Sequence, residues 1–178
     1  MRRSVSQVLL AVAALLACMG QTCSPSTPAG VPTSVPEGVY SGQVTTTIRL
    51  LLDNELQNEK TTTENYTQAF GSDGSPLNDQ KSPLYVGFTD TQTVGGMTVT
   101  LTITSIQPTA NGVTVNYTAT FEVPAGNQVI ELTGTGQSTF TLASAGAVEY
   151  SMTLSVSFTD QNGSAVSTDL QATGTLYR

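Results

Sequence analysis

Most of this chain alternates between apolar and polar positions with a period of two. Thr and Ser fill most of the polar positions between residues 39 and 178. Successive side chains of a β-strand point to opposite faces of the sheet, so this period predicts strands with one apolar face. No segment of this region shows the helical period of 3.6. The clearest alternating segments are Met97–Ile103, Val113–Val123, Ile130–Leu142, Val148–Phe158 and Val166–Leu176.

Short turn sequences between these segments predict how the strands pair. Pro124–Asn127 is typical of a four-residue hairpin loop, which places Phe121 opposite Ile130. The same loop places Tyr117 opposite Gly134, where an aromatic ring covers the gap that a strand glycine leaves.

A second hairpin is predicted at Asn162–Ser164, which suits a three-residue loop. This loop matches Val156 with Leu170 and Tyr150 with Leu176. A further tight turn is indicated by Asn-Gly at residues 111–112. We expect a β-bulge near residues 104–105, because without it the preceding strand would turn Ile103 to the wrong face.

Short hairpin loops between strands of this length favour an antiparallel up-and-down meander. We therefore predict an all-β fold, a barrel of about eight strands in which the first strand, Tyr40–Leu52, pairs with the last. The start Gly38–Gly42 and the close Gly174–Tyr177 resemble lipocalins in general layout, with Tyr40 in place of the Trp of the usual Gly-x-Trp signature. The alternative is an immunoglobulin-like β-sandwich, which the long strands and the missing Cys–Trp–Cys core disfavour.

The expected second strand, Gln57–Phe70, breaks the alternation. Lys60 and Glu64 share its even phase with Tyr66 and Phe70. One hypothesis is a polar patch at a barrel mouth, where Lys60, Glu64 and Tyr66 orient a small ligand above an apolar interior. The alternatives are an edge or overhanging strand end protected by charge, or a bulge that turns both charged residues outward.

The N-terminus has the order of features found in bacterial lipoproteins. Two arginines precede an apolar run at residues 8–17, which is too short to span a bilayer. Leu15–Cys18 (LLAC) then resembles the lipobox of these proteins. The resemblance implies cleavage before Cys18 and attachment of lipid to that residue. The alternative is ordinary cleavage a few residues later, which would remove Cys18.

This interpretation divides the chain into a signal peptide (1–17), a lipid-bearing Cys18 with a Pro/Ser/Thr-rich tether (18–38) and a β-barrel domain (39–178). Met19 rather than Asp follows the cysteine, which indicates the outer membrane if the usual bacterial sorting pattern applies. Cys23 would remain as an odd thiol in an oxidising compartment.

Composition excludes several classes of function. The chain has 13 acidic and 6 basic residues, and it lacks His and Trp. Removal of the signal peptide with Arg2 and Arg3 leaves 4 − 13 = −9 formal charges, which argues against nucleic acid as a partner. No nucleophile–base pair, metal-ligand cluster or phosphate-binding loop is present, so we expect neither an enzyme nor a bound metal or cofactor.

The sequence therefore predicts a cell-envelope lipoprotein whose β-barrel head is a non-catalytic binding or structural module. Two alternatives remain open. The head is a carrier of a small apolar ligand in the barrel interior, or it is an enzyme without a recognisable motif. The partners expected are the membrane, through the N-terminal lipid, and either a small apolar ligand or an envelope protein. The ligand-binding candidates are Lys60, Glu64, Tyr66 and Phe70.

Overall fold

Strands make up nearly all of the part of the chain that the structure describes. The computed structural model describes residues 34–78, 82–94, 97–125, 128–159 and 163–178. These residues form ten strands, and the Thr- and Val-rich segments have the side chains that suit a pleated, half-buried surface. The strands are β1 (Gly38–Leu52), β2 (Glu55–Phe70), β3 (Pro76–Asn78), β4 (Ser82–Pro83), β5 (Thr89–Val94), β6 (Met97–Thr109), β7 (Gly112–Ala125), β8 (Gln128–Ser144), β9 (Ala147–Thr159) and β10 (Ala165–Tyr177). Among the described residues, no helix is long and apolar enough to cross a membrane.

All described strands belong to one antiparallel sheet, in the order β4-β3-β2-β1-β10-β9-β8-β7-β6-β5. The predicted all-β meander is confirmed, and so is the pairing of the first long strand with the last, which sets Ile48 of β1 opposite Leu170 of β10. The sheet has ten strands where about eight were expected, because the connection between β2 and β6 contributes three short ones.

The meander is not closed into a barrel by strand pairing. Its two ends are β4 and β5, and the chain between them only bridges the gap. Leu84 N donates to Pro76 O at 2.9 Å on one side, and Ile103 N donates to Phe88 O at 2.9 Å on the other. The regular strand pairing stops in this segment, where Pro83 has no N–H to donate and Gly87 has a positive φ of 90°.

The predicted register of the β7–β8 hairpin is wrong by two residues. Phe121 lies opposite Leu132 and Tyr117 lies opposite Gly136, because the ladder continues to Ala125 and leaves a shorter loop than expected. A slip of two residues keeps every side chain on its face, so the apolar face was assigned correctly. An aromatic ring does cover a strand glycine here. A Cβ added to Gly136 would lie closest to the Tyr117 ring carbon Cε2.

The predicted register of the β9–β10 hairpin is also wrong by two residues, but in the opposite direction, because this ladder ends earlier and leaves a longer loop than expected. The predicted bulge is confirmed. Val156 lies opposite Thr168, and Tyr150 lies opposite Gly174. In the β6–β7 ladder the register shifts between Ile103 and Ser105, where the bulge was expected. Both Ile103 and Ile106 are consequently buried on the same side.

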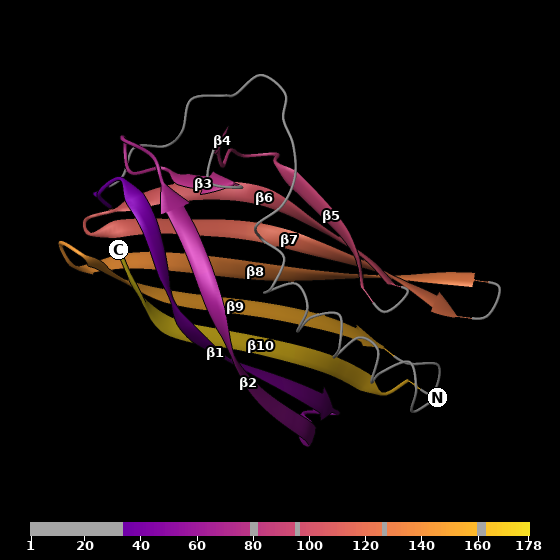
Figure 1. Cartoon of the computed structure of the whole chain (residues 1–178). Coiled ribbons are helices and arrows are strands. Elements are labelled where there is room, and N and C mark those ends of the chain that lie inside the picture. Colours follow the sequence, from indigo (N-terminus) through magenta and orange to yellow (C-terminus); the bar gives the residue numbers. More distant parts are fainter. Residues whose placement is uncertain (1–33, 79–81, 95–96, 126–127, 160–162) are drawn as a thin grey trace.

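The sheet curls so that its inner face forms the core. Figure 1 shows β1 and β2 crossing in front of the long strands β8, β9 and β10. Aromatic contacts join these layers. Tyr66 of β2 stacks on Tyr150 of β9 with ring centroids 4.7 Å apart, and Phe70 of β2 meets the edge of Phe140 of β8 at 5.4 Å. The largest fully buried side chains are Tyr40, Tyr150, Phe70, Phe121, Ile48, Met152, Leu154, Leu170, Leu176 and Val35.

Candidate functional site

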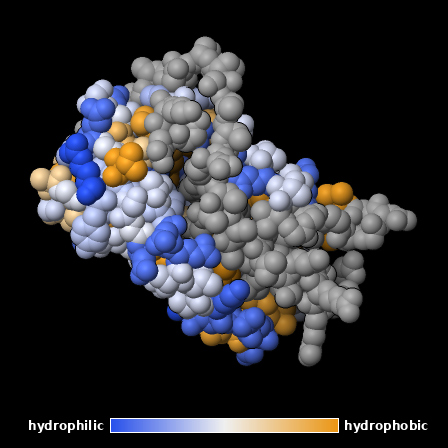
Figure 2. Space-filling view, viewed as in Figure 1, coloured by the Kyte–Doolittle hydropathy of each residue, from blue (hydrophilic) through white to orange (hydrophobic). Residues whose placement is uncertain are grey.

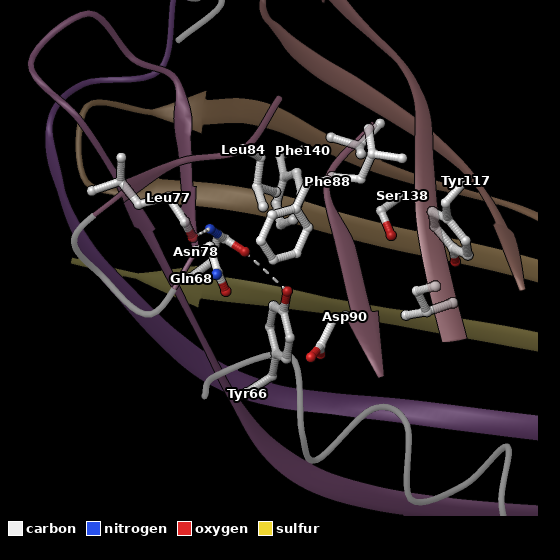
Figure 3. Close-up of a pocket in the computed structure, with 13 residues that line it drawn as sticks. Tyr66, Gln68, Leu77, Asn78, Leu84, Phe88, Asp90, Tyr117, Ser138 and Phe140 are labelled. Carbon is white, nitrogen blue, oxygen red and sulfur yellow. Dashed lines mark hydrogen bonds between the residues drawn. The ribbon is translucent and has the colours of Figure 1, made fainter. Parts of the chain in front are cut away.

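A small pocket lies on the inner face, where β2 approaches the opposite end of the curled sheet (Figure 3). Its volume is about 70 Å³, which is room for a few water molecules or a very small organic molecule. Most of its surface is apolar, with a few polar groups among aliphatic and aromatic side chains. The lining residues are Tyr66, Gln68, Leu77, Asn78, Leu84, Phe88, Asp90, Leu101, Ile103, Val115, Tyr117, Ser138 and Phe140.

The polar groups reach the pocket because they occupy inward positions of their strands. Tyr66 and Gln68 share the inward phase of β2, and both are buried. Tyr117 of β7 and Ser138 of β8 occupy inward positions of the neighbouring ladder. Asp90 comes from β5 at the far end of the sheet. Residues distant in sequence therefore meet only because the sheet curls.

Gln68 is held rigidly by hydrogen bonds. Its Nε2 donates to Ala69 O and to Leu77 O, each at 2.9 Å. Its Oε1 accepts a hydrogen bond of 3.1 Å from the hydroxyl of Tyr66, as the dashed line in Figure 3 marks. On another wall, the Tyr117 hydroxyl donates to Thr153 O at 3.3 Å. These bonds use the donors of both tyrosines and orient their rings.

Two buried hydroxyl groups next to this network have no hydrogen-bond partner in the described part of the chain. They are Ser138 Oγ and Tyr150 Oη. The Tyr150 hydroxyl lies near those of Tyr66 and Ser138, but none of these neighbours is placed to complete a hydrogen bond with it. A buried hydroxyl without a partner costs free energy. Of the two residues, Ser138 lines the pocket, so its hydroxyl can bind a water molecule or the polar end of a ligand there.

The phenols of this cluster stay neutral at physiological pH. Burial raises the pKa of the Tyr150 hydroxyl to about 12. Burial, together with the neighbouring Tyr150 and Tyr117 hydroxyls, also raises the pKa of Tyr66 well above its usual value. The pKa of Tyr117 is raised too, by burial first and by Tyr150 second. Neutral phenols donate hydrogen bonds but supply neither a nucleophile nor a general base, so the cluster suits binding rather than catalysis.

The structure brings together only part of the predicted ligand site. Tyr66 lines the pocket, whereas Phe70 is buried beside it, in edge contact with Phe140 and with Tyr40. Lys60 and Glu64 are exposed and do not line the pocket. Their side chains lie on the same face of β2 as Tyr66. This part of β2 is at the edge of the sheet, however, and the described residues do not cover that face there.

Sequence reasoning missed five polar residues of the pocket: Gln68, Asn78, Asp90, Tyr117 and Ser138. Two of them carried a signal in the sequence. Gln68 stands on the inward phase between Tyr66 and Phe70, and Ser138 interrupts the inward apolar series of β8. A polar residue at a core position indicates a buried hydrogen-bond network. Asp90 carried no such signal, because its position depends on how the sheet curls.

The predicted lipidation site, Cys18, lies outside the described residues. Asp73, in the loop between β2 and β3, is not among the residues that line the pocket. Asp73 accepts hydrogen bonds from Ser75 N at 3.0 Å and Ser75 Oγ at 2.6 Å, which is the chemistry of a turn. These bonds lower the pKa of the Asp73 carboxyl. Among the described residues, no three His, Cys, Asp or Glu side chains are grouped so as to hold a metal ion.

Replacing the unpartnered tyrosine gives a direct test of the cluster. Tyr150→Phe removes a buried hydroxyl without breaking a hydrogen bond, so the free energy of unfolding should rise by about 1 kcal/mol. Tyr117→Phe is the matched control. It removes the hydrogen bond from Tyr117 to Thr153 O and should lower stability by about 1 kcal/mol. Urea unfolding of both variants measures whether the free energy of unfolding rises or falls in each. Equal losses in both would contradict this account and mean that the Tyr150 hydroxyl has a bound partner.

Comparison with protein-family models, with curated proteins and with solved structures gave no match to this chain.

Proposed function

We propose that this protein is a lipid-anchored module of the bacterial cell envelope, attached through Cys18, whose β-sheet head binds or supports a partner without catalysis. The proposal that the head is not catalytic is supported by the composition of its interior. Aromatic and aliphatic side chains fill it. Its pocket of about 70 Å³ is lined mainly by apolar groups, and its polar lining consists of neutral phenols, two amides, one hydroxyl and the single carboxyl of Asp90.

The filled core favours a function carried by the surface. Carriers of drug-sized ligands have pockets of roughly 300–1,000 Å³, well above the volume found here. The outer face of the β1–β2 hairpin is instead covered with hydroxyl groups. Thr45 bonds Thr63 and Thr47 bonds Thr61, each at 3.1 Å across the ladder. Such a polar face suits contact with the wet environment of the envelope, either a protein partner or the cell wall.

A second candidate function is the binding of a very small molecule in the pocket. The unpartnered hydroxyl of Ser138, which lines the pocket, favours it. A ligand for this site would have one polar group that forms a hydrogen bond with the Ser138 hydroxyl and a short apolar part that packs against Phe88 and Leu101. The interior would then act as a sensor or store for that molecule.

Native mass spectrometry of the protein extracted from its own membrane in mild detergent tests both functions. The expected mass is that of a chain that begins at Cys18 and carries acyl groups, with nothing else bound. Additional mass that is lost on unfolding would replace the first candidate function with the second. A chain without acyl groups would contradict the anchor.

Replacement of the two cysteines provides the matched controls for the anchor. Cys18→Ala should abolish acylation and release the head from the membrane fraction, because the acyl chains supply the binding free energy. Cys23→Ala should leave both acylation and membrane association unchanged. Membrane fractionation measures the association of each variant with the membrane, and its mass shows whether it is acylated. Membrane association that survives Cys18→Ala would rule out Cys18 as the anchor.

A further inference from the structure

The longest unpaired edge of the described sheet lies on β2. β1 pairs with β2 along its whole length, but β3 pairs only with Ala69 and Phe70. On that side, the backbone N–H and C=O groups of Glu55–Gln68 therefore have no ladder partner among the described residues. An open edge of this length is a template for pairing with another strand.

The side chains along this edge are hydrophilic and accessible. Residues 55–65 are exposed on both faces, except for the partly buried Thr62. In Figure 2 blue and white colours cover most of the visible surface over β2. Leu52 and Leu56, near the turn of the β1–β2 hairpin, are exposed apolar side chains. An apolar partner strand would gain little here, so polar and charge complementarity would decide which strand pairs.

The hairpin that carries the edge is held in place. Asp53 and Asn54 form its turn with positive φ values of 49° and 66°. Asp53 N donates to Ala165 O at 2.7 Å, and Ala165 N donates back to Asp53 Oδ1 at 2.9 Å. Arg49 forms an ion pair of 2.7 Å with Glu59 on the outer face. A rigid edge loses less conformational entropy when a partner strand binds.

We propose that two copies of this chain associate through antiparallel pairing of their β2 edges, centred on Thr62. In this register Lys60 of one copy lies opposite Glu64 of the other, and the two-fold symmetry produces this pair twice. The same register uses most of the free edge. Asn58 of one copy lies opposite Tyr66 of the other at one end, and Tyr66 lies opposite Asn58 at the other end. It also sets Thr61 opposite Thr63, which extends the hydroxyl rows of the β1–β2 ladder into the second copy.

The positions of the charges select this register against others. Moving the symmetry axis to Lys60 would oppose two lysines, and moving it to Glu64 would oppose two glutamates. Like charges directly across a ladder are destabilising, whereas opposite charges stabilise it. Within one copy, Lys60 faces Ile48 and Glu64 faces Val44 across the β1 ladder, so neither charge has an opposite charge across from it there. The charges that discourage pairing with unrelated strands thus complement a second copy.

Disulfide crosslinking in native membranes tests the symmetry axis. In the full-length chain with Cys23→Ser, Thr62→Cys places two thiols directly opposite each other, within reach of a disulfide. Ser151→Cys is the control, because Ser151 is exposed on β9, a central strand. Oxidation should convert most of the Thr62→Cys protein to a dimer and little of the Ser151→Cys protein. Equal yields would overturn the proposal.

Charge reversal in the same Thr62→Cys background tests the register. Lys60→Glu places a glutamate opposite Glu64 at both symmetry-related positions and should reduce the dimer yield by about tenfold. Glu64→Lys alone should reduce it similarly, and the double variant Lys60→Glu with Glu64→Lys should restore it. A single reversal without effect, or a double variant that stays monomeric, would overturn the proposal. The acyl mass of each variant reports the anchor separately, so the two proposals can fail independently.

Discussion

Above pH 10 the folded protein is expected to lose stability at about 4 kcal/mol per pH unit. The cause is the buried cluster of Tyr66, Tyr117 and Tyr150. Burial raises the pKa of each hydroxyl in the folded state, to about 12 for Tyr150, whereas the unfolded chain keeps values near 10.0. The unfolded state therefore releases protons first as the pH rises.

The direction of this pH dependence follows from the linkage between proton binding and unfolding. Below pH 10 both states hold the three phenolic protons, and the contribution of the cluster to stability is fully present. Between pH 10 and about 12 the unfolded chain is ionised at three positions where the folded chain is not. Each such proton contributes a slope of about −1.4 kcal/mol per pH unit, so three contribute about −4.

The measurement is the free energy of urea unfolding at a series of pH values across this window, with tyrosinate absorbance followed in parallel. The triple variant Tyr66→Phe, Tyr117→Phe and Tyr150→Phe should remove most of the slope. Tyr177→Phe is the matched control, because this tyrosine is exposed, and it should leave the slope unchanged. A wild-type slope no steeper than that of the triple variant would show that the cluster does not control alkaline unfolding.

Phe140→Ala is expected to lower the free energy of unfolding by about 3–5 kcal/mol. The Phe140 ring is 2% exposed and touches two partners, Phe70 at 5.4 Å and Tyr150 at 5.1 Å between ring centroids. Truncation leaves a cavity between β2 and β8, where aromatic contacts join the two layers of the curled sheet. A loss of this size is a large fraction of the stability of an ordinary domain.

Phe158→Ala is the matched control for this substitution. Phe158 lies on the same face near the end of β9, but it is only partly buried. Its truncation should cost clearly less than that of Phe140, and urea unfolding of both variants measures the difference. Because Phe140 also lines the pocket, its variant should bind small apolar molecules that the native protein excludes. Equal losses in the two variants would mean that the Phe140 contacts do not join the layers.

The sequence alone was sufficient for the long strands and for their apolar faces. These features depend on local properties, namely a side-chain period of two and turns of few residues. The bulge near Ser105 followed from the same logic, because one residue had to be added to keep Ile103 inward. The registers of both long hairpins were wrong by two residues, since the loop lengths are set by how far each ladder continues and not by the turn residues alone.

Only the tertiary structure decided where the sheet stops and what meets inside it. Lys60, Glu64 and Tyr66 have the same phase, but Tyr66 is buried under the curl while the other two lie on an open edge. Alternation specifies which face of a strand a residue occupies, and it contains no information about what covers that face. The curl of the whole sheet brings Tyr66, Ser138 and Asp90 to one pocket, because it depends on the summed twist and packing of all the strands rather than on any one segment.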